Sequence, residues 1–388
     1  MAESTEPPKG IGRVIGDGRA TLRERHLAAV LQLALTGDGT TRAEVARQTG
    51  LAPATVSSLV AELISLGYLQ IGPTLGSTGG KPAQRIQAEP GTYGVLAVLV
   101  ARNHLQAAIY DLTGRRVGQN GRQLDRLVTV ADISDLCRRM TRHSTLTLRA
   151  VAVEIPGVVT GDGRVADSVQ LDWHDVAVAG PVRDACGLPV HLINDADAES
   201  FGELLGSPGP ERNFLYLHLG VGVGGAVVQS SRLMTGRTGQ VGELGHVRVD
   251  FAEDAPQCRC GARGCVEAVA SLTTILGDVR AAAGPPDRIR ELARSAPVRA
   301  RSARAAAQLA RVLPVVCATI DLPEVVIGGP ANALGDFFLD ALRTELGRYP
   351  AIGARPVQVG YAQVDDPYLG VAGHALHREL GVRWVAAD

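Results

Sequence analysis

The sequence predicts an α/β protein in which a small, mainly helical N-terminal domain precedes a larger domain made of two α/β lobes. Between residues 20 and 66 apolar residues recur at helical spacing, whereas from Gly91 onward short apolar runs typical of strands alternate with helical stretches. A glycine-rich turn follows an apolar run in "HLGVGVGGAVV" and again in "VVIGGP". A chain of 388 residues is too long for one hydrophobic core, and 45% hydrophobic with 20% charged residues is typical of globular proteins.

The first domain is expected to span residues 20–90, after a Pro/Gly-rich tail (1–19) that we expect to be disordered. Its first helix is "LRERHLAAVLQLAL", and "TTRAEVARQTGLAPATVSSLVAELISLGYLQIG" then has the layout of a helix-turn-helix. Thr41 caps a helix, with Glu44 as its capping-box partner. Gly50 forms the turn, and Pro53 begins a second helix, which stops at Gly67.

That second helix has the pattern of a helix that reads DNA. One face is apolar and is expected to pack inward through Val56, Leu59, Leu63 and Leu66, while its N-terminal end presents small and hydroxyl side chains. The following segment, "YLQIGPTLGSTGGKPAQRIQ", predicts a β-hairpin wing whose tip enters a minor groove. The candidate DNA contacts are Arg42, Pro53, Ala54, Thr55, Ser57, Ser58, Gly80 and Lys81.

An alternative for this domain is a three-helix cap or interaction module that never touches DNA. Residues 20–90 carry roughly balanced charge, and the whole chain has a net charge of −1, so the electrostatic signal for nucleic acid is weak. The turn spacing, the hydroxyl-rich helix start and the wing together favour DNA binding.

The stretch "QCRCGARGCVEA" gathers three of the six cysteines of the chain within residues 257–268. No secretory signal or run of eighteen apolar residues is present, so we expect a cytoplasmic protein without a membrane span, where a disulfide framework is improbable. Three thiolates need a fourth ligand to hold tetrahedral zinc, and the nearest upstream histidine is His246. The spacing therefore predicts a structural zinc site formed by His246, Cys258, Cys260 and Cys265, the alternative being three surface or half-buried thiols.

The larger domain reads as two similar lobes, about 91–195 and 196–388, with a cleft between them. "YGVLAVLVARNHLQAAIYD" predicts an antiparallel hairpin, and "LRAVAVEIPGVV" and "LPVHLIND" predict further strands of the first lobe. The second lobe begins with two strands in "NFLYLHLGVGVGGAVV", and an alanine-rich helix around residues 299–319 precedes the strand in "EVVIGGP".

Five motifs, "INDADA", "GVGVGGAVV", "GELGHVRVD", "CRCGARGCVEA" and "VVIGGP", in this order and spacing, resemble the ROK family of repressors, open reading frames and sugar kinases. The resemblance covers essentially the whole chain, because residues 20–90 resemble the winged helix-turn-helix of the repressor branch. It implies a two-lobed actin-like/ribonuclease H-like ATPase fold for residues 91–388. It also implies structural zinc on the same histidine and three cysteines.

The resemblance further implies a sugar site. The positions that hydrogen-bond sugar hydroxyls in the family correspond here to Asn194, Asp195, Glu243, His246 and Glu267. Carboxylates and an amide suit this task, since each can engage a pair of vicinal hydroxyls, and a metal-held imidazole is fixed in one tautomer. In "ADSVQLDWHDV", which resembles the loop that closes on the sugar, Gln170 stands where the family usually has asparagine.

Catalysis is not expected. In kinase members of the family Asp195 would be the general base, and a glycine-rich Asp-X-Gly-X-Thr turn after the first strand would hold the ATP phosphates. Here Ala101, Arg102 and Asn103 occupy that region, without the acid or the glycine. The glycines of "GVGVGG" survive, but a glycine loop between strands can serve close packing alone.

The sequence thus predicts a sugar-responsive transcriptional repressor. As a homodimer, with pairing into a tetramer left open, it would place two recognition helices on a palindromic operator in double-stranded DNA. The effector would be a sugar or sugar phosphate. Two alternatives stay open: a ROK sugar kinase that carries a DNA-binding domain, and a constitutive regulator whose sugar pocket is vestigial or which answers to a protein partner. Activation of transcription, rather than repression, also stays open.

Overall fold

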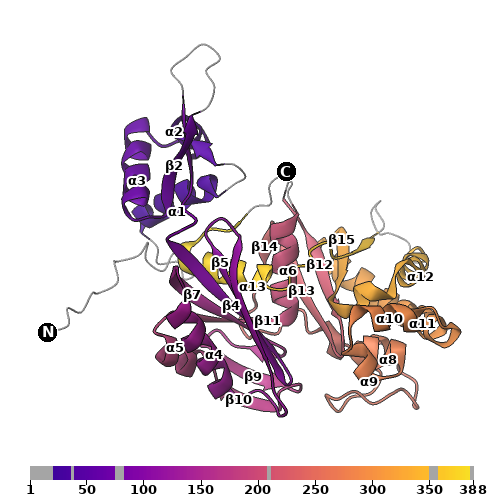
Figure 1. Cartoon of the computed structure of the whole chain (residues 1–388). Helices are drawn as coiled ribbons and strands as arrows, with labels where there is room; N and C mark the ends of the chain where they lie inside the picture. Colours follow the sequence, from indigo (N-terminus) through magenta and orange to yellow (C-terminus); the bar gives the residue numbers. More distant parts are fainter. Residues whose placement is uncertain (1–20, 36–38, 75–82, 208–210, 349–356, 385–388) are drawn as a thin grey trace. The chain divides into compact units, whose positions relative to one another are not determined.

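The computed structural model describes residues 21–35, 39–74, 83–207, 211–348 and 357–384. The chain forms two compact units (Figure 1). Unit 1 comprises Met1–Asn194, Leu205–Pro208 and Asp366–Asp388, and unit 2 comprises Asp195–Leu204 and Gly209–Asp365. The expected tail (1–19) and two of the candidate DNA contacts, Gly80 and Lys81, lie outside the described residues.

The helix-turn-helix consists of α1 (Leu22–Ala34), α2 (Arg42–Thr49) and α3 (Pro53–Ser65). The Thr41 side chain caps α2 by accepting a hydrogen bond from the backbone N–H of Glu44 at 3.2 Å. The Glu44 carboxylate turns to Arg47, whose Nε lies 3.0 Å away. Gly50 ends α2 at φ +70°, and proline occupies the first turn of α3, as the sequence predicts.

Three short strands complete this N-terminal part, which we call the head (described residues 21–88). β2 (Leu69–Thr74) and β3 (Gln84–Ala88) form an antiparallel hairpin, and β1 (Thr40–Thr41) pairs with the other edge of β3. Val56, Leu59 and Leu63 are buried as the apolar pattern of α3 predicts, while Leu66 is only half-buried.

The rest of unit 1, which we call lobe 1 (residues 93–194 and 366–384), is built on a five-stranded sheet in the order β11-β7-β4-β5-β6. Its strands are β4 (Tyr93–Ala101), β5 (His104–Asp111), β6 (Arg116–Gln123), β7 (Thr147–Ile155) and β11 (Val190–Asn194). The predicted hairpin of β4 and β5 is present, and β7 and β11 run parallel to β4. A small sheet of β8 (Val158–Val159), β9 (Arg164–Ser168) and β10 (Trp173–Ala177) follows β7.

Helices cover both faces of this sheet (Figure 1). Leu96, Val98 and Val100 of β4 share one core with α4 (Val130–His143) and α5 (Ala179–Cys186). The opposite face of β4, β7 and β11 is covered by α13 (Leu369–Leu380), whose buried residues are mostly small and apolar. The C-terminal segment therefore belongs to unit 1, whereas the sequence-based division placed all of 196–388 in the second lobe.

Unit 2 contains a sheet in the order β14-β13-β12-β15-β16. Its strands are β12 (Phe214–Leu219), β13 (Val223–Gln229), β14 (Arg232–Leu233), β15 (Glu324–Gly328) and β16 (Gln358–Tyr361). Its helices are α6 (Asp195–Gly206), α7 (Val266–Ala270), α8 (Leu272–Leu276), α9 (Val279–Ala282), α10 (Pro286–Ala293), α11 (Ala296–Ile320) and α12 (Asp336–Leu346). The last two residues of α6, Leu205 and Gly206, fall in unit 1. Two short 3-10 helices are η1 (Leu244–His246) and η2 (Gly329–Leu334).

Side chains of β12 alternate between two environments, as expected for a strand covered on both faces. Leu215, Leu217 and Leu219 join the core formed with α11 and α12, whereas Tyr216 and His218 point to the other face. Helix α11 has the length and apolar composition of a membrane span, a test that a buried core helix also passes. Leu309 and Leu313 of this helix are fully buried in the core of unit 2.

Candidate functional site

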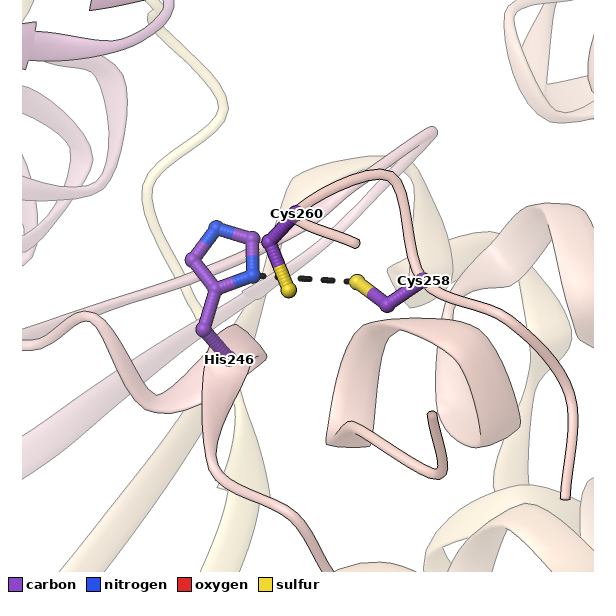
Figure 2. A group of neighbouring side chains, drawn as sticks. All are labelled: His246, Cys258 and Cys260. Atoms are coloured by element: carbon purple, nitrogen blue, oxygen red, sulfur yellow. Dashed lines mark hydrogen bonds between the residues drawn. The ribbon is translucent and has the colours of Figure 1, made fainter. Parts of the chain in front are cut away.

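The histidine and three cysteines that the sequence singles out lie together in unit 2. His246 ends η1, Cys258 and Cys260 lie in the following loop, and Cys265 caps the N-terminus of α7. Cys258 Sγ lies 3.8 Å from His246 Nδ1, and Cys260 Sγ lies 3.8 Å from Cys265 Sγ. Figure 2 shows the ring of His246 and the thiols of Cys258 and Cys260 pointing toward one another. The ligand atoms of these three residues all lie within 4.8 Å of one another.

His246, Cys258 and Cys260 lie close enough to hold a metal ion together, and Cys265 lies beside Cys260. Zinc–sulfur bonds of about 2.3 Å place two thiolates of a tetrahedron about 3.8 Å apart. Burial raises the pKa of the Cys265 thiol to about 12, whereas the backbone N–H of Ala262 lowers the pKa of the Cys260 thiol. Cys265 therefore keeps its proton at neutral pH unless a cation displaces it, so metal binding here would release protons.

Two glycines shape the cysteine loop, both with positive φ. Gly264 has φ +71°, and a Cβ at this position would lie 1.9 Å from the carbonyl oxygen of Asp250. The Gly264 carbonyl in turn accepts hydrogen bonds from the backbone N–H groups of Val249 and Asp250. Gly261 has φ +90°, but a Cβ there would meet no atom within 4 Å.

The two glycines give a matched pair of substitutions. We expect Gly264→Ala to prevent metal loading and to cost about 3 kcal/mol or more of stability, because it combines backbone strain with a steric overlap. Gly261→Ala should cost only about 1 kcal/mol from its φ angle and should still load metal. Metal content per chain and thermal melting of both variants provide the test, and equal losses in the two would contradict the role of close packing.

Four of the five sugar-site candidates belong to unit 2, and Asn194 ends β11 in unit 1. Asp195 begins α6 and its Oδ1 accepts from the backbone N–H of Ala196 at 2.9 Å. Glu267 Oε2 accepts from the backbone N–H of Val223 at 3.2 Å. Glu243 directly precedes η1, and its Oε2 lies 3.9 Å from His246 Nε2, on the opposite side of the ring from the thiols.

The glycines at the start of β13 bring the unit 2 candidates together. A Cβ on Gly222 would lie 2.7 Å from Glu267 Oε2, and one on Gly224 would lie 3.3 Å from the Cβ of Ala196, beside Asp195. Gly225 packs in the same way against the Gly242 carbonyl oxygen, 2.8 Å from the position of its Cβ, next to Glu243. The glycine run is therefore needed for close packing of α6, the Glu243 segment and Glu267 against β13.

Sequence reasoning missed a group of three residues on the other face of β12, namely Tyr216 and His218 of β12 and Glu199 of α6. His218 Nδ1 lies 2.8 Å from Glu199 Oε2, and the Tyr216 hydroxyl also hydrogen-bonds Glu199. The imidazole fills the space beside two glycine turns, because a Cβ on Gly220 or Gly329 would approach the ring within 2.6 or 2.8 Å. No local pattern marks this group, since a single histidine on an apolar strand is usually a core residue.

Carboxylates dominate the electrostatics of this region. Burial raises the pKa of Asp195, with the charge of His218 opposing the shift and that of Glu199 adding to it. Burial and the charges of Asp195 and Glu243 raise the pKa of Asp197 to about 7. Arg259 is the cation beside Glu267, with Nε 3.4 Å from Oε1, and it is largely exposed.

Two further predicted features can be placed. Residues 102–103 form the tight turn between β4 and β5, where the Arg102 and Asn103 carbonyls accept from the backbone N–H groups of Val128 and Leu124. Arg102 Nη1 also donates to the Gln170 carbonyl at 3.2 Å.

In α3 the exposed N-terminal candidates for DNA contact are Pro53, Ala54, Thr55, Ser57 and Ser58, and Arg42 of α2 is half-buried.

The sequence model of the ROK family matches residues 97–372. The chain belongs to the ROK family. The model of the IclR helix-turn-helix domain matches residues 24–71, which include α1, α2 and α3. In this ROK protein an IclR-type helix-turn-helix domain therefore precedes the ROK domain within one chain.

Named relatives of this ROK protein include repressors. It is 25% identical over 354 residues to the xylose repressor of Caldicellulosiruptor bescii, covering 83% of this chain and 87% of that protein. It is 27% identical over 244 residues to the xylose repressor of Bacillus subtilis, but spans only 62% of that protein and 61% of itself. Sugar kinases are also among the curated relatives.

A solved structure of a ROK family transcriptional regulator, a homologue of the Escherichia coli Mlc protein, superposes with a TM-score of 0.74. The match covers 92% of this chain and 98% of the other, at 21% sequence identity. The likeness confirms the predicted fold over both the head and the ROK domain.

Proposed function

We propose that this chain is a sugar-responsive transcriptional repressor that binds DNA through α3 and a sugar through the carboxylate-rich site in unit 2. The observation that carries the proposal is the joining, in one chain, of an IclR-type helix-turn-helix to a ROK domain with Asp195, Glu243 and Glu267 packed around one glycine run. Relatives named as repressors support the same conclusion.

Sugar binding would use Asn194, Asp195, Glu243, His246 and Glu267 as hydrogen-bonding partners of the hydroxyls. The metal we propose for His246, Cys258, Cys260 and Cys265 is zinc, which suits one imidazole and three thiolates and would serve a structural role. Because Glu267 lies two residues after Cys265 on α7, holding the cysteines would also hold this carboxylate.

The effector class follows from the charges of the site. Burial is the main cause that raises the pKa of Asp197 to about 7, and the negative charges of Asp195 and Glu243 add to the rise, so this region already concentrates negative charge. A phosphate group adds about 1.5 to 2 negative charges at pH 7. Two like charges about 5 Å apart repel by about 3 kcal/mol at an effective dielectric constant of 20. We therefore favour an uncharged sugar over a sugar phosphate.

This preference gives a direct comparison. We expect D-xylose, D-glucose or another neutral sugar that binds to do so at least about 100-fold more tightly than its phosphate ester, in line with a repulsion of about 3 kcal/mol. Isothermal titration of the zinc-loaded protein with each pair at one ionic strength makes the measurement. Equal or tighter binding of the phosphate would contradict the argument from charge.

On DNA, the chain would act as a cytoplasmic homodimer. Each α3 would enter a major groove of a palindromic operator, with the exposed Thr55, Ser57 and Ser58 near phosphates and base edges. A sugar changes operator affinity only if it binds the two states of the protein differently. Phosphoryl transfer is not part of the proposal, because the turn at 101–103 lacks the acid and the glycine expected for phosphate binding.

The deciding experiment is fluorescence anisotropy of the zinc-loaded protein on a duplex that the wild-type chain selects from a random library. Specific binding that one sugar weakens supports the sensor. Specific binding that no tested sugar changes favours a constitutive regulator, and formation of ADP from ATP with any tested sugar would restore the kinase alternative.

A further inference from the structure

The end of the recognition helix is held by a residue of lobe 1. Tyr93, the first residue of β4, donates its hydroxyl hydrogen to the carbonyl oxygen of Leu66 at 2.9 Å. Leu66 is the C-cap residue of α3. Carbonyls in the last turn of a helix have no partner within the helix, so this tyrosine satisfies one of them from outside.

The surroundings of this bond form a closely packed joint. Tyr68 stacks on Tyr93 with ring centroids 4.5 Å apart, and the Arg149 guanidinium of β7 lies 5.4 Å from the centroid of the Tyr93 ring. Gly67, at φ +78°, lets α3 end against Thr92, whose Cγ2 would lie 3.0 Å from a Cβ at that glycine. Burial raises the pKa of Tyr68 to about 12, as expected where water is excluded.

A second attachment joins α1 to the segment that follows α13. The side-chain amide of Gln32 donates from Nε2 to the Arg383 carbonyl at 2.8 Å and accepts from the Arg383 backbone N–H at 2.9 Å. The next residue, Trp384, is buried in lobe 1, where Nε1 donates to the Leu112 carbonyl at 3.0 Å. Through Arg383, α1 is therefore tied to the same lobe that holds α3.

We propose that Tyr93 and Gln32 are positioning residues that seat the head on lobe 1, so that lobe 1 sets the orientation of the recognition helix. A domain tied at one point can swivel about it, whereas attachments on two different helices remove that freedom. This proposal rests on the proposed function in one respect. Sugar binding would change lobe 1, and the contacts of Tyr93 and Gln32 would transmit that change to the head.

The test uses the full-length, zinc-loaded protein with Tyr93→Phe, Gln32→Met and the double variant. Tyr361→Phe is the matched control, because it removes a tyrosine-to-carbonyl hydrogen bond of the same length, 2.9 Å to Gly335, within unit 2. Hydrogen exchange read by mass spectrometry should show at least tenfold faster exchange around residues 66–68 in Tyr93→Phe and at Arg383 in Gln32→Met. Tyr361→Phe should leave both regions unchanged.

The second readout is the sugar-induced change in operator affinity, measured on the library-selected duplex. We expect the sugar-induced change in operator affinity to be at least fivefold smaller in the double variant than in the wild type. Sugar affinity and melting temperature should equal those of the wild type, a combination that a merely structural role would not produce. The proposal would be overturned if hydrogen exchange around residues 66–68 and at Arg383 stayed at the wild-type rate in the variants. It would also be overturned if the double variant kept the whole sugar-induced change in operator affinity. If the wild-type protein does not respond to any sugar, the proposed function fails, and hydrogen exchange alone decides whether the joint exists.

Discussion

Replacing Asp195 with asparagine is expected to abolish measurable sugar binding while leaving the fold and sugar-free operator binding intact. Asparagine keeps the shape of the side chain but loses the charge, and hydrogen bonds to charged groups contribute about 1.5 to 3 kcal/mol each. Two such bonds correspond to at least a 100-fold loss of affinity, since about 1.4 kcal/mol is a factor of ten. Asparagine keeps Oδ1 as an acceptor for the backbone N–H of Ala196 at the start of α6, so this local contact is retained in the variant.

Isothermal titration measures the affinity, and operator anisotropy with and without sugar measures the response. Asp287→Asn is a suitable control, because this side chain is 95% exposed on α10 of the same unit. Sugar affinity within threefold of the wild type in Asp195→Asn would show that the sugar lies elsewhere.

Replacing Cys265 with serine is expected to release the metal and to unfold the loop that carries the site. Cys265 is fully buried, is the N-cap residue of α7 and lies against Cys260, so serine here would remove a ligand of the proposed metal and leave a hydroxyl in a buried position. Structural zinc supplies about 10 to 16 kcal/mol of apparent binding free energy in small zinc domains at neutral pH, which is comparable to the total stability of a domain. We therefore expect the melting temperature of unit 2 to fall by more than about 10 °C, since about 1 kcal/mol shifts the melting of such a domain by 2–4 °C.

Cys317→Ser is the control for burying a serine, because Cys317 is also buried in unit 2 but lies on α11, outside the cysteine cluster. Metal content and calorimetry, with and without a chelator, separate the two variants. A metal-free protein with unchanged sugar affinity would contradict the coupling between the cysteine cluster and Glu267.

Local signals in the sequence were sufficient for the head and for the cysteine cluster. Thr41, Gly50 and Pro53 each act on the backbone of their own helix, so their effects can be predicted from neighbours a few residues away. Three cysteines within eight residues must lie close together in any fold, which is why the cluster could be predicted without the structure.

Contacts between distant segments left no such signal. Glu199 and His218 meet only because α6 lies on the face of β12 opposite to its leucines, and Tyr93 reaches Leu66 only because α3 ends against Thr92. Likewise the small apolar residues of α13 predict a buried helix but not the sheet that buries it. The sugar residues were placed by family resemblance, and the packing around Gly222 and Gly224 was visible only in the structure.

Because the C-terminal segment returns to unit 1, the head is synthesised before the residue to which α1 is attached. The head leaves the ribosome first, yet Arg383, its partner for Gln32, is 351 residues further along. At about 5 to 20 residues per second, translation needs roughly 20 to 70 s to cover that distance. A nascent or truncated chain that lacks Arg383 therefore lacks the attachment of Gln32, and by our proposal its head is not yet held on lobe 1.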